Sequence, residues 1–182
     1  MTLRQPAQTR ERLLAAALHQ MREHGSNGLT LDVVAKEAGV SKGGLLHHFP
    51  SKNALIEALL RQLFSDFEGR VQHYYEAEPP APGRLIRAYI RATFEEEPLP
   101  LELTMMLMGD VAHNPALMTM IREDFQRWHE RLLADGLPPA RATILRQAAD
   151  SYWTERLIFP DAPAALERQQ IVDELLRLSV VE

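Results

Sequence analysis

The stretch that decides the fold is residues 30–52, TLDVVAKEAGVSKGGLLHHFPSK. Thr30 stands where the N-cap of a helix belongs, and apolar residues at helical spacing follow it as far as Gly39. Ser41 can cap a second short helix, which Pro50 ends. Glycine supplies the positive φ that a tight turn between two helices requires. The pattern therefore predicts a helix-turn-helix.

The second short helix has one apolar face, formed by Leu45 and Phe49 four residues apart. Its other positions face outward, and they are Lys42, Gly43, Gly44, His47 and His48. Consecutive glycines near a helix start each cost about 1 kcal/mol relative to alanine, which favours a backbone that a partner approaches closely, such as the major groove of DNA. Fraying of a short helix is the simpler explanation of the glycines, and αα-corners in ordinary cores can share the helix-turn-helix pattern.

The flanks and the charge support a phosphate-binding role. Thr30 and Lys52 lie on either side of the unit, where a hydroxyl, a helix N-terminus or an ammonium group can hold phosphates, although each can equally be a cap or a solvated lysine. Residues 1–52 hold seven Lys and Arg and four acidic residues, a net charge of +3. The other 130 residues hold thirteen Lys and Arg and 21 acidic residues, a net charge of −8. Phosphate would therefore be attracted to the first segment and repelled by the rest.

Helical patterning continues along the whole chain, so we expect an all-α fold of about nine helices. The longest is predicted over residues 52–76, and a run of prolines and glycine at 78–83 must end it. The predicted helices cover residues 9–24, 30–38, 41–49, 52–76, 84–96, 99–112, 115–134, 139–159 and 164–179.

Composition excludes several classes of function. The 182 residues are 46% apolar and 25% charged, as expected of a soluble globular protein, and the absence of cysteine excludes disulfides, thiolate zinc sites and cysteine nucleophiles. The longest apolar run is six residues, Leu13–Leu18, whereas a membrane span needs roughly 20, so we expect a cytoplasmic protein.

No sequence motif indicates an enzyme. The chain lacks a Gly-rich phosphate loop, a Gly-x-Ser-x-Gly elbow and a His-Glu-x-x-His helix, so we expect neither catalysis nor a cofactor. Asp110 with His113 and His129 with Glu130 could be drawn as metal ligands, but nothing makes them face each other, and no metal site is predicted.

Residues 30–45, followed by HFPSKNAL at 48–55, closely resemble the DNA-binding signature of the TetR family of bacterial transcriptional repressors. The resemblance covers about residues 9–60, and beyond them it is one of length and helical pattern. It implies a three-helix DNA-binding domain at 1–51 and a larger ligand-binding and dimerisation domain at 52–182. It also implies that the third helix enters the major groove of a near-palindromic operator.

Carried over by position, the resemblance implies that Ser41, Lys42, Gly43 and Gly44 meet bases or nearby backbone. It implies phosphate contacts for Thr30, His47, His48 and Lys52. The chain departs from the family at Leu46, where tyrosine is very common, so a usual phosphate or thymine-methyl contact is lost or replaced. That departure affects the operator sequence more than the activity.

Methionine and aromatic residues are concentrated in the second half of the chain, which suits a pocket for an apolar or aromatic ligand of loosely specified shape. Such residues also fill ordinary cores, and the pocket hypothesis depends on the set and on the resemblance rather than on one side chain. The candidate ligand-binding residues are Phe94, Met105, Met106, Met108, Met120, Phe125, Trp128 and Tyr152.

The last two predicted helices carry apolar stripes, one of which includes small residues that permit close helix packing. They can close the chain's own core, but the resemblance implies that they pack against their copies in a homodimer. The candidate interface residues are Leu145, Ala148, Ala149, Trp153, Ile171 and Leu175.

The sequence thus predicts a ligand-responsive, DNA-binding repressor that acts as a homodimer and is released from DNA by a small apolar or aromatic ligand. The alternatives are a small-molecule binding protein or an all-α enzyme in which the helix-turn-helix serves only packing. Specific retardation of DNA would distinguish the first from the other two.

Overall fold

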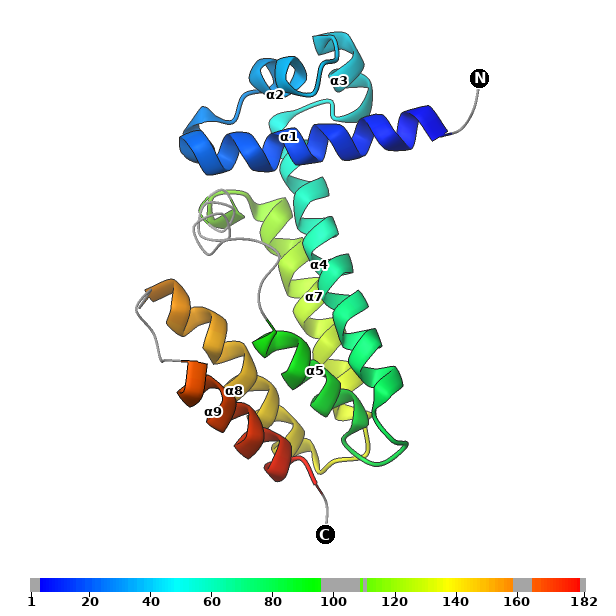
Figure 1. Cartoon of the computed structure of the whole chain (residues 1–182), viewed down its shortest axis with the longest axis vertical. Coiled ribbons are helices and arrows are strands. Elements are labelled where there is room, and N and C mark those ends of the chain that lie inside the picture. The colour runs from blue at the N-terminus through cyan, green and yellow to red at the C-terminus, as the bar shows by residue number, and fades with distance from the viewer. Residues whose placement is uncertain (1–3, 96–108, 110, 159–164, 181–182) are drawn as a thin grey trace. The chain divides into compact units, whose positions relative to one another are not determined.

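A computed structural model describes residues 4–95, 109, 111–158 and 165–180 of the chain. Eight helices are described and these residues contain no strand, which confirms the all-α prediction (Figure 1). The helices are α1 Arg4–Gly28, α2 Leu31–Glu37, α3 Lys42–His48, α4 Lys52–Ala77, α5 Arg84–Phe94, α7 Pro115–Leu133, α8 Pro139–Ile158 and α9 Ala165–Leu178.

Helix bounds agree with the sequence pattern to within one or two residues for most elements. The first helix is the exception, because it begins at Arg4 rather than Thr9 and continues to Gly28. Its regular geometry is nevertheless interrupted at Gly25, directly after the predicted end at residue 24, where a φ of 70° lies in the left-handed region. The helix predicted over 99–112 lies largely outside the described residues.

The chain forms two compact units. Unit 1 comprises Met1–Leu63 and Leu99–Met118, and unit 2 comprises Phe64–Pro98 and Thr119–Glu182. The division falls inside α4 and near the start of α7, so each of these helices contributes residues to both units.

Unit 1 is built around α1, against which α2 packs, while α3 packs against α2 (Figure 1). Leu13 of α1, Val34 of α2 and Leu45 of α3 are fully buried in this unit. The Arg12 guanidinium donates to the carbonyl of Ala38 at the end of α2, which fixes α2 on α1. Helices as short as α2 and α3 are not stable alone, so this packing holds them in place.

Unit 2 is organised around α5, which packs against α8 and α9. Eight of its 11 residues are buried, so α5 is the central helix of the unit. Its N-cap, Gly83, has no side chain, and Asp135 from the connection between α7 and α8 replaces the missing cap. The Asp135 carboxylate accepts hydrogen bonds from the amides of Leu85 at 2.9 Å and Ile86 at 2.8 Å.

None of the described helices is both long enough and apolar enough to cross a membrane.

Candidate nucleic-acid interface and ligand site

The turn between α2 and α3 has the geometry that the sequence predicts. Thr30 Oγ1 accepts from the amide of Val33 at 3.3 Å, and Ser41 Oγ accepts from the amide of Gly44 at 3.1 Å, so both helices begin at side-chain caps. Gly39 turns the chain with a φ of 65°, and the amide of Val40 then donates to Ala35 at 3.0 Å. The Gly39 turn and the Ser41 cap together fix the point at which α3 begins.

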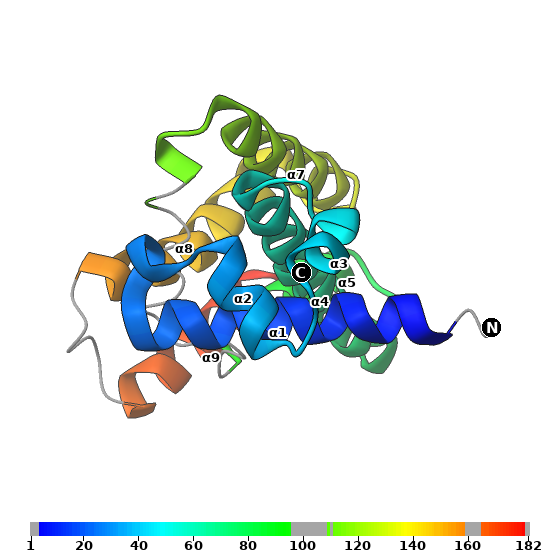
Figure 2. The same cartoon turned by 90° about the horizontal axis from the view of Figure 1, so that it is seen from above.

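The start of α3 forms an open surface, and Figure 2 looks down on α2 and α3. Ser41, Lys42, Gly43 and His47 are exposed, and Gly44 is half-buried. A Cβ built on Gly43 would meet nothing within 4 Å, so a partner backbone can approach it closely. The opposite face of α3 is held by the buried Leu45.

Lys42 forms an ion pair that sequence reasoning missed. Its Nζ donates to Asp32 Oδ2 of α2 at 2.9 Å, and both side chains are more than half exposed. The partner lies ten residues earlier on another helix, so no local spacing rule could have found it. Exposed pairs of this kind contribute about 0–1 kcal/mol and are readily exchanged for another partner such as a phosphate.

The remaining predicted phosphate contacts lie at the two ends of the helix pair. Thr30 begins α2 and is exposed, His48 ends α3 and is half-buried, and Lys52 begins α4 and is half-buried. His47 and His48 are neighbours whose rings meet edge to face at 5.6 Å. Leu46, which stands at the family's usual tyrosine position, is 38% exposed.

Three aromatic rings from three helices of unit 2 meet edge to face, and we call them the aromatic trio. They are Phe67 of α4, Tyr89 of α5 and Trp128 of α7, with centroids 5.2 Å apart for Phe67 and Tyr89, 5.5 Å for Phe67 and Trp128 and 5.3 Å for Tyr89 and Trp128. Sequence reasoning chose only Trp128 of these three as a ligand-site residue. The apolar periodicity of α4 was the available signal for Phe67.

A buried polar chain adjoins the aromatic trio. Tyr89 Oη donates to Asp150 Oδ1 at 2.6 Å, and Arg146 Nη1 donates to Asp150 Oδ2 at 2.5 Å. Burial raises the pKa of Asp150 above its ordinary value, although the hydrogen bonds from Tyr89 and Arg146 oppose that shift. Burial and the neighbouring Asp150 carboxylate also raise the pKa of Tyr89, so its hydroxyl keeps its proton.

The other predicted ligand-site residues are distributed as follows. Phe94 and Tyr152 are buried and stack at 4.3 Å. Met120 is half-buried, whereas Phe125 is 53% exposed. Met105, Met106 and Met108 lie outside the described residues. No three His, Asp or Glu side chains among the described residues are grouped as metal ligands.

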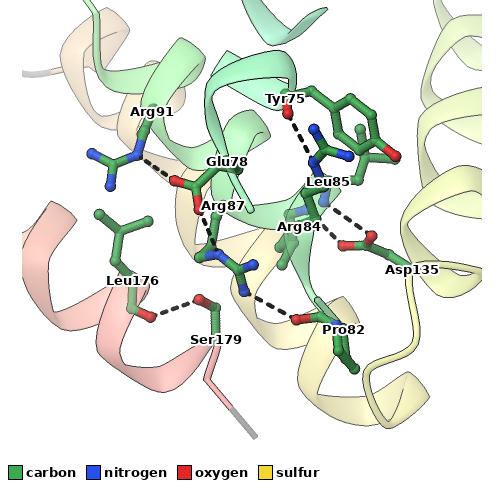
Figure 3. A network of polar contacts seen from close by, with 11 residues as sticks. Tyr75, Glu78, Pro82, Arg84, Leu85, Arg87, Arg91, Asp135, Leu176 and Ser179 are labelled. Atoms are coloured by element: carbon green, nitrogen blue, oxygen red, sulfur yellow. Dashed lines mark hydrogen bonds and ion pairs between the residues drawn. The ribbon is translucent and has the colours of Figure 1, made fainter. Parts of the chain in front are cut away.

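The end of α4 is fastened by a polar network that joins it to α5 (Figure 3). The Glu78 carboxylate accepts from Arg87 Nε and Arg91 Nε, each at 3.0 Å, and Arg87 Nη1 also donates to the carbonyl of Pro82 at 3.0 Å. Burial alone would raise the pKa of Glu78, but the hydrogen bonds and charges of the two arginines lower it below its ordinary value. Arg84 Nε donates to the carbonyl of Tyr75 at 2.8 Å and adds a further link.

The residues predicted for a dimer interface fall into two groups. Leu145 and Ala149 of α8 and Leu175 of α9 are buried within the single chain, Ala148 is half-buried, and the side chain of Trp153 is outside the described part. Ile171 is 40% exposed. Two further apolar side chains on these helices are exposed, Leu178 at 42%, which belongs to the apolar stripe of the last helix, and Ile144 at 64%, which the stripe pattern did not include.

Two family models match this chain. One, for bacterial regulatory proteins of the tetR family, matches residues 13–59, and the other, for the tetracyclin repressor-like C-terminal domain, matches residues 83–180. The HTH-type transcriptional regulator BetI of Burkholderia thailandensis is 30% identical over 146 residues, which span 77% of this chain and 73% of that protein.

Solved structures agree with the family models. A transcriptional regulator from Rhodococcus sp. Rha1 shares the fold at a TM-score of 0.73 and 24% identity, covering 95% of this chain and 99% of that one. The multidrug binding protein EbrR, solved with malachite green, matches at a TM-score of 0.66 and 26% identity, and the match covers 94% of this chain and 98% of that one. The helix-turn-helix and the helical second unit therefore define a DNA-binding transcriptional regulator. The chain belongs to the TetR family.

Proposed function

We propose that this protein is a ligand-responsive repressor that binds a near-palindromic operator as a homodimer and is released by a small apolar or aromatic effector. Residues 1–51 form the DNA-binding domain and residues 52–182 the ligand-binding and dimerisation domain. The protein then acts on DNA in the cytoplasm, and its activity is binding rather than catalysis.

The exposed start of α3 is the observation that carries the proposal. Ser41 caps the helix, Gly43 leaves its backbone uncovered, and Lys42 places an ammonium group beside it. A narrow helix end with small residues enters a major groove, and the flanking Thr30 and Lys52 then lie where phosphates pass. The side chains of α3 contact bases, and its flanks fix the register.

The homodimer is supported by apolar side chains left exposed on α8 and α9. Ile144, Ile171 and Leu178 are large apolar residues at the surface of the single chain. Burying them against a second copy removes apolar surface from water. A two-fold axis also places two recognition helices about 34 Å apart, one turn of DNA, on one face of the duplex.

The effector is supported by the aromatic side chains inside unit 2 and by the relative EbrR, which is described as a multidrug binding protein complexed with malachite green. Because α4 contributes residues to both units, a ligand that prefers one arrangement of α4 changes the spacing of the two recognition helices. The change in DNA affinity cannot exceed the preference of the ligand for that arrangement.

The test is a gel-retardation assay with duplexes from the regions beside the protein's own gene. We expect a specific complex that the Lys42→Ala variant weakens at several salt concentrations. Arg61→Ala is the matched control, because it removes the same charge from an exposed position on α4, where Arg61 pairs with Glu57 four residues earlier. Retardation no stronger than that of unrelated DNA, or equal loss in both variants, contradicts the proposal.

A further inference from the structure

Arg10 of α1 is an exposed arginine whose N–H donors have no acceptor among the described residues. Its guanidinium carbon lies 5.4 Å from the centroid of the Phe49 ring, which ends α3. Other arginines of unit 1 are used within the fold. Arg12 donates to the carbonyl of Ala38, and Arg61 pairs with Glu57 on α4. The donors of Arg10 are therefore available to an acceptor outside the chain.

The Phe49 ring holds the Arg10 guanidinium in place. Phe49 is only 3% exposed, and its amide donates to the carbonyl of Leu45 at 2.8 Å, so the ring is fixed by the core of unit 1. A cation over a ring face is attracted to it, and a stacked guanidinium keeps its N–H edges free. A side chain that is already ordered loses less conformational freedom when it binds. Arg10 is thus preorganised for a planar, bidentate contact.

Arg10 lies at the same end of α3 as two of the predicted phosphate contacts. The His48 ring centroid is 6.4 Å from that of Phe49, and Lys52 begins α4 three residues after Phe49. Both Figure 1 and Figure 2 show α3 beside the N-terminal half of α1. Three helices, α1, α3 and α4, therefore each bring a side chain that can contact phosphate to the end of α3.

The positive charge at this end of α3 is not balanced by an ion pair to Arg10. Asp32 pairs with Lys42, where α3 begins, and Glu37 pairs with His19 between α1 and α2. Arg10 has no carboxylate partner among the residues that the structure describes. The start of α4 adds the partial positive charge of a helix N-terminus. An anion is the kind of partner that these groups fit.

We propose that Arg10 contacts a DNA phosphate beside the end of α3, and that Phe49 is the residue that positions it. The guanidinium donates two hydrogen bonds to the phosphate oxygens, next to the contacts of His48 and Lys52. This inference rests on the proposed function, since it adds a contact from the first helix to that DNA interface. Every sequence carries phosphates, so Arg10 supplies affinity and register rather than base selectivity.

Arg10→Gln removes the charge at an exposed position, and its effect is measured by fluorescence anisotropy over a series of salt concentrations. The probes are the operator duplex found by gel retardation and a labelled random duplex. Affinity for both should fall by a similar factor, about tenfold or more at low salt. The slope of log affinity against log salt should decrease by about 2 in a dimer, about 1 for each copy. Arg61→Gln, the matched control on α4, should leave the slope unchanged.

Methylphosphonate substitution of the operator locates the contact. Each modified duplex replaces one phosphate by an uncharged group. At one position in each half-site, the replacement should cost the natural protein about tenfold in affinity and the Arg10→Gln variant less than about twofold. A merely structural effect of the substitution would be the same at every phosphate, so this readout identifies Arg10 as a contact.

Two further variants test the positioning role of the Phe49 ring. Phe49→Leu should reduce operator affinity about threefold, and it should have no further effect in the Arg10→Gln background. Arg10→Lys keeps the charge and loses the planar fork, so the salt slope should remain while affinity falls about threefold. If Phe49→Leu does not fold, Arg10→Lys tests the same stacking, because lysine lacks the planar group that lies over the ring.

The inference is overturned if Arg10→Gln changes neither affinity nor salt slope, if Arg61→Gln has the same effect, or if no methylphosphonate position distinguishes the natural protein from Arg10→Gln. Specific operator binding by the natural protein would leave the proposed function standing in each of these cases. A slope change on random duplex without any specific complex rejects the repressor while the phosphate contact stands. Absence of binding to every duplex rejects both.

Discussion

Lys42 shows how a single exposed ion pair can tune DNA binding. Asp32 Oδ2 holds the Lys42 ammonium at the start of α3 and also offsets its charge. A phosphate that approaches Lys42 must compete with Asp32, and it is repelled by the same carboxylate. We therefore expect Asp32 to lower the affinity for any duplex and to leave the bases to supply more of the specific binding energy.

The Asp32→Asn variant should therefore bind non-specific duplex DNA about three- to tenfold more tightly at low salt. The measurement is fluorescence anisotropy with a labelled random duplex over a series of salt concentrations. The effect should shrink in the Lys42→Ala background, because the freed ammonium group is absent there. An equal effect in both backgrounds would show that Asp32 acts by simple repulsion and does not restrain Lys42.

Gly43 is a second position where one substitution can separate an effect on DNA affinity from an effect on stability. A Cβ there meets nothing within 4 Å, so Gly43→Ala should fold normally and gain up to about 1 kcal/mol from the higher helix propensity of alanine. Its DNA affinity should fall about tenfold, because in the proposed complex the added methyl group would face the groove. Thermal unfolding and anisotropy measure the two effects. Unchanged DNA affinity would mean that the glycine serves the protein alone.

Gly83 provides the structural contrast to Gly43. It has a φ of 78°, and a Cβ would lie 2.8 Å from the carbonyl oxygen of Ser179. Alanine at this position would be strained in any arrangement of its neighbours, which is not the case at Gly43. Comparing the unfolding of the two alanine variants therefore separates a glycine that the fold requires from one that it does not.

At the scale of elements, the junction between α4 and α5 depends on Glu78. Its carboxylate accepts from Arg87 and Arg91, and these contacts lower its pKa below the ordinary value. A carboxyl group with a lowered pKa in the folded state stabilises the protein above its ordinary pKa, and that stability is lost as the pH falls through the folded-state pKa.

Glu78→Gln should accordingly lower the free energy of unfolding by about 1–3 kcal/mol at neutral pH, because two charge-assisted hydrogen bonds are weakened. The difference from the natural protein should shrink as the pH falls below about 4.5, the ordinary value for glutamate. Urea unfolding at a series of pH values measures it. Glu76→Gln, at an exposed position nearby, is the control. A difference that is independent of pH would show that the charge of Glu78 is not responsible.

Local signals explain which elements could be predicted. Thr30 and Ser41 cap the helices that follow them, so α2 and α3 were placed from neighbouring residues alone. The cap of α5 could not be predicted in this way, because Gly83 has no side chain and the carboxylate that replaces it, Asp135, is 50 residues from Leu85 in the sequence. The same holds for Tyr89 and Asp150, which are 61 positions apart.

The candidate sites divide along the same line. Lys42 and Gly43 were chosen from the pattern of a single short helix, and both are exposed on α3. Predicting the interface residues requires knowing which side of α8 faces the chain's own core. Leu145 and Ala149 face it, and the exposed Ile144 next to them was missed. A stripe pattern identifies an apolar face but does not say whether the chain itself covers it.

At the scale of the whole molecule, the DNA-binding and dimerisation proposals are linked. One recognition helix covers one half-site of the operator. In the proposed dimer, once the first copy is bound, the recognition helix of the second copy binds the other half-site in an intramolecular step. The exposed Ile144 on α8 and Ile171 on α9 are the apolar side chains that we propose for the contact between copies. Substitution there should change DNA affinity although neither residue touches DNA.

Ile144→Glu combined with Ile171→Glu should give a folded monomer, because the exposed side chains contribute little to the core of the single chain and two carboxylates cannot be buried unpaired between copies. Sedimentation velocity should show the loss of the dimer. Affinity for an operator duplex should fall about 100-fold or more at the same chain concentration. Gln126→Glu, an exposed residue of α7, controls for added negative charge. A dimer that survives the double substitution would reject this face as the interface, and a monomer that binds the operator undiminished would reject the link between dimerisation and DNA binding.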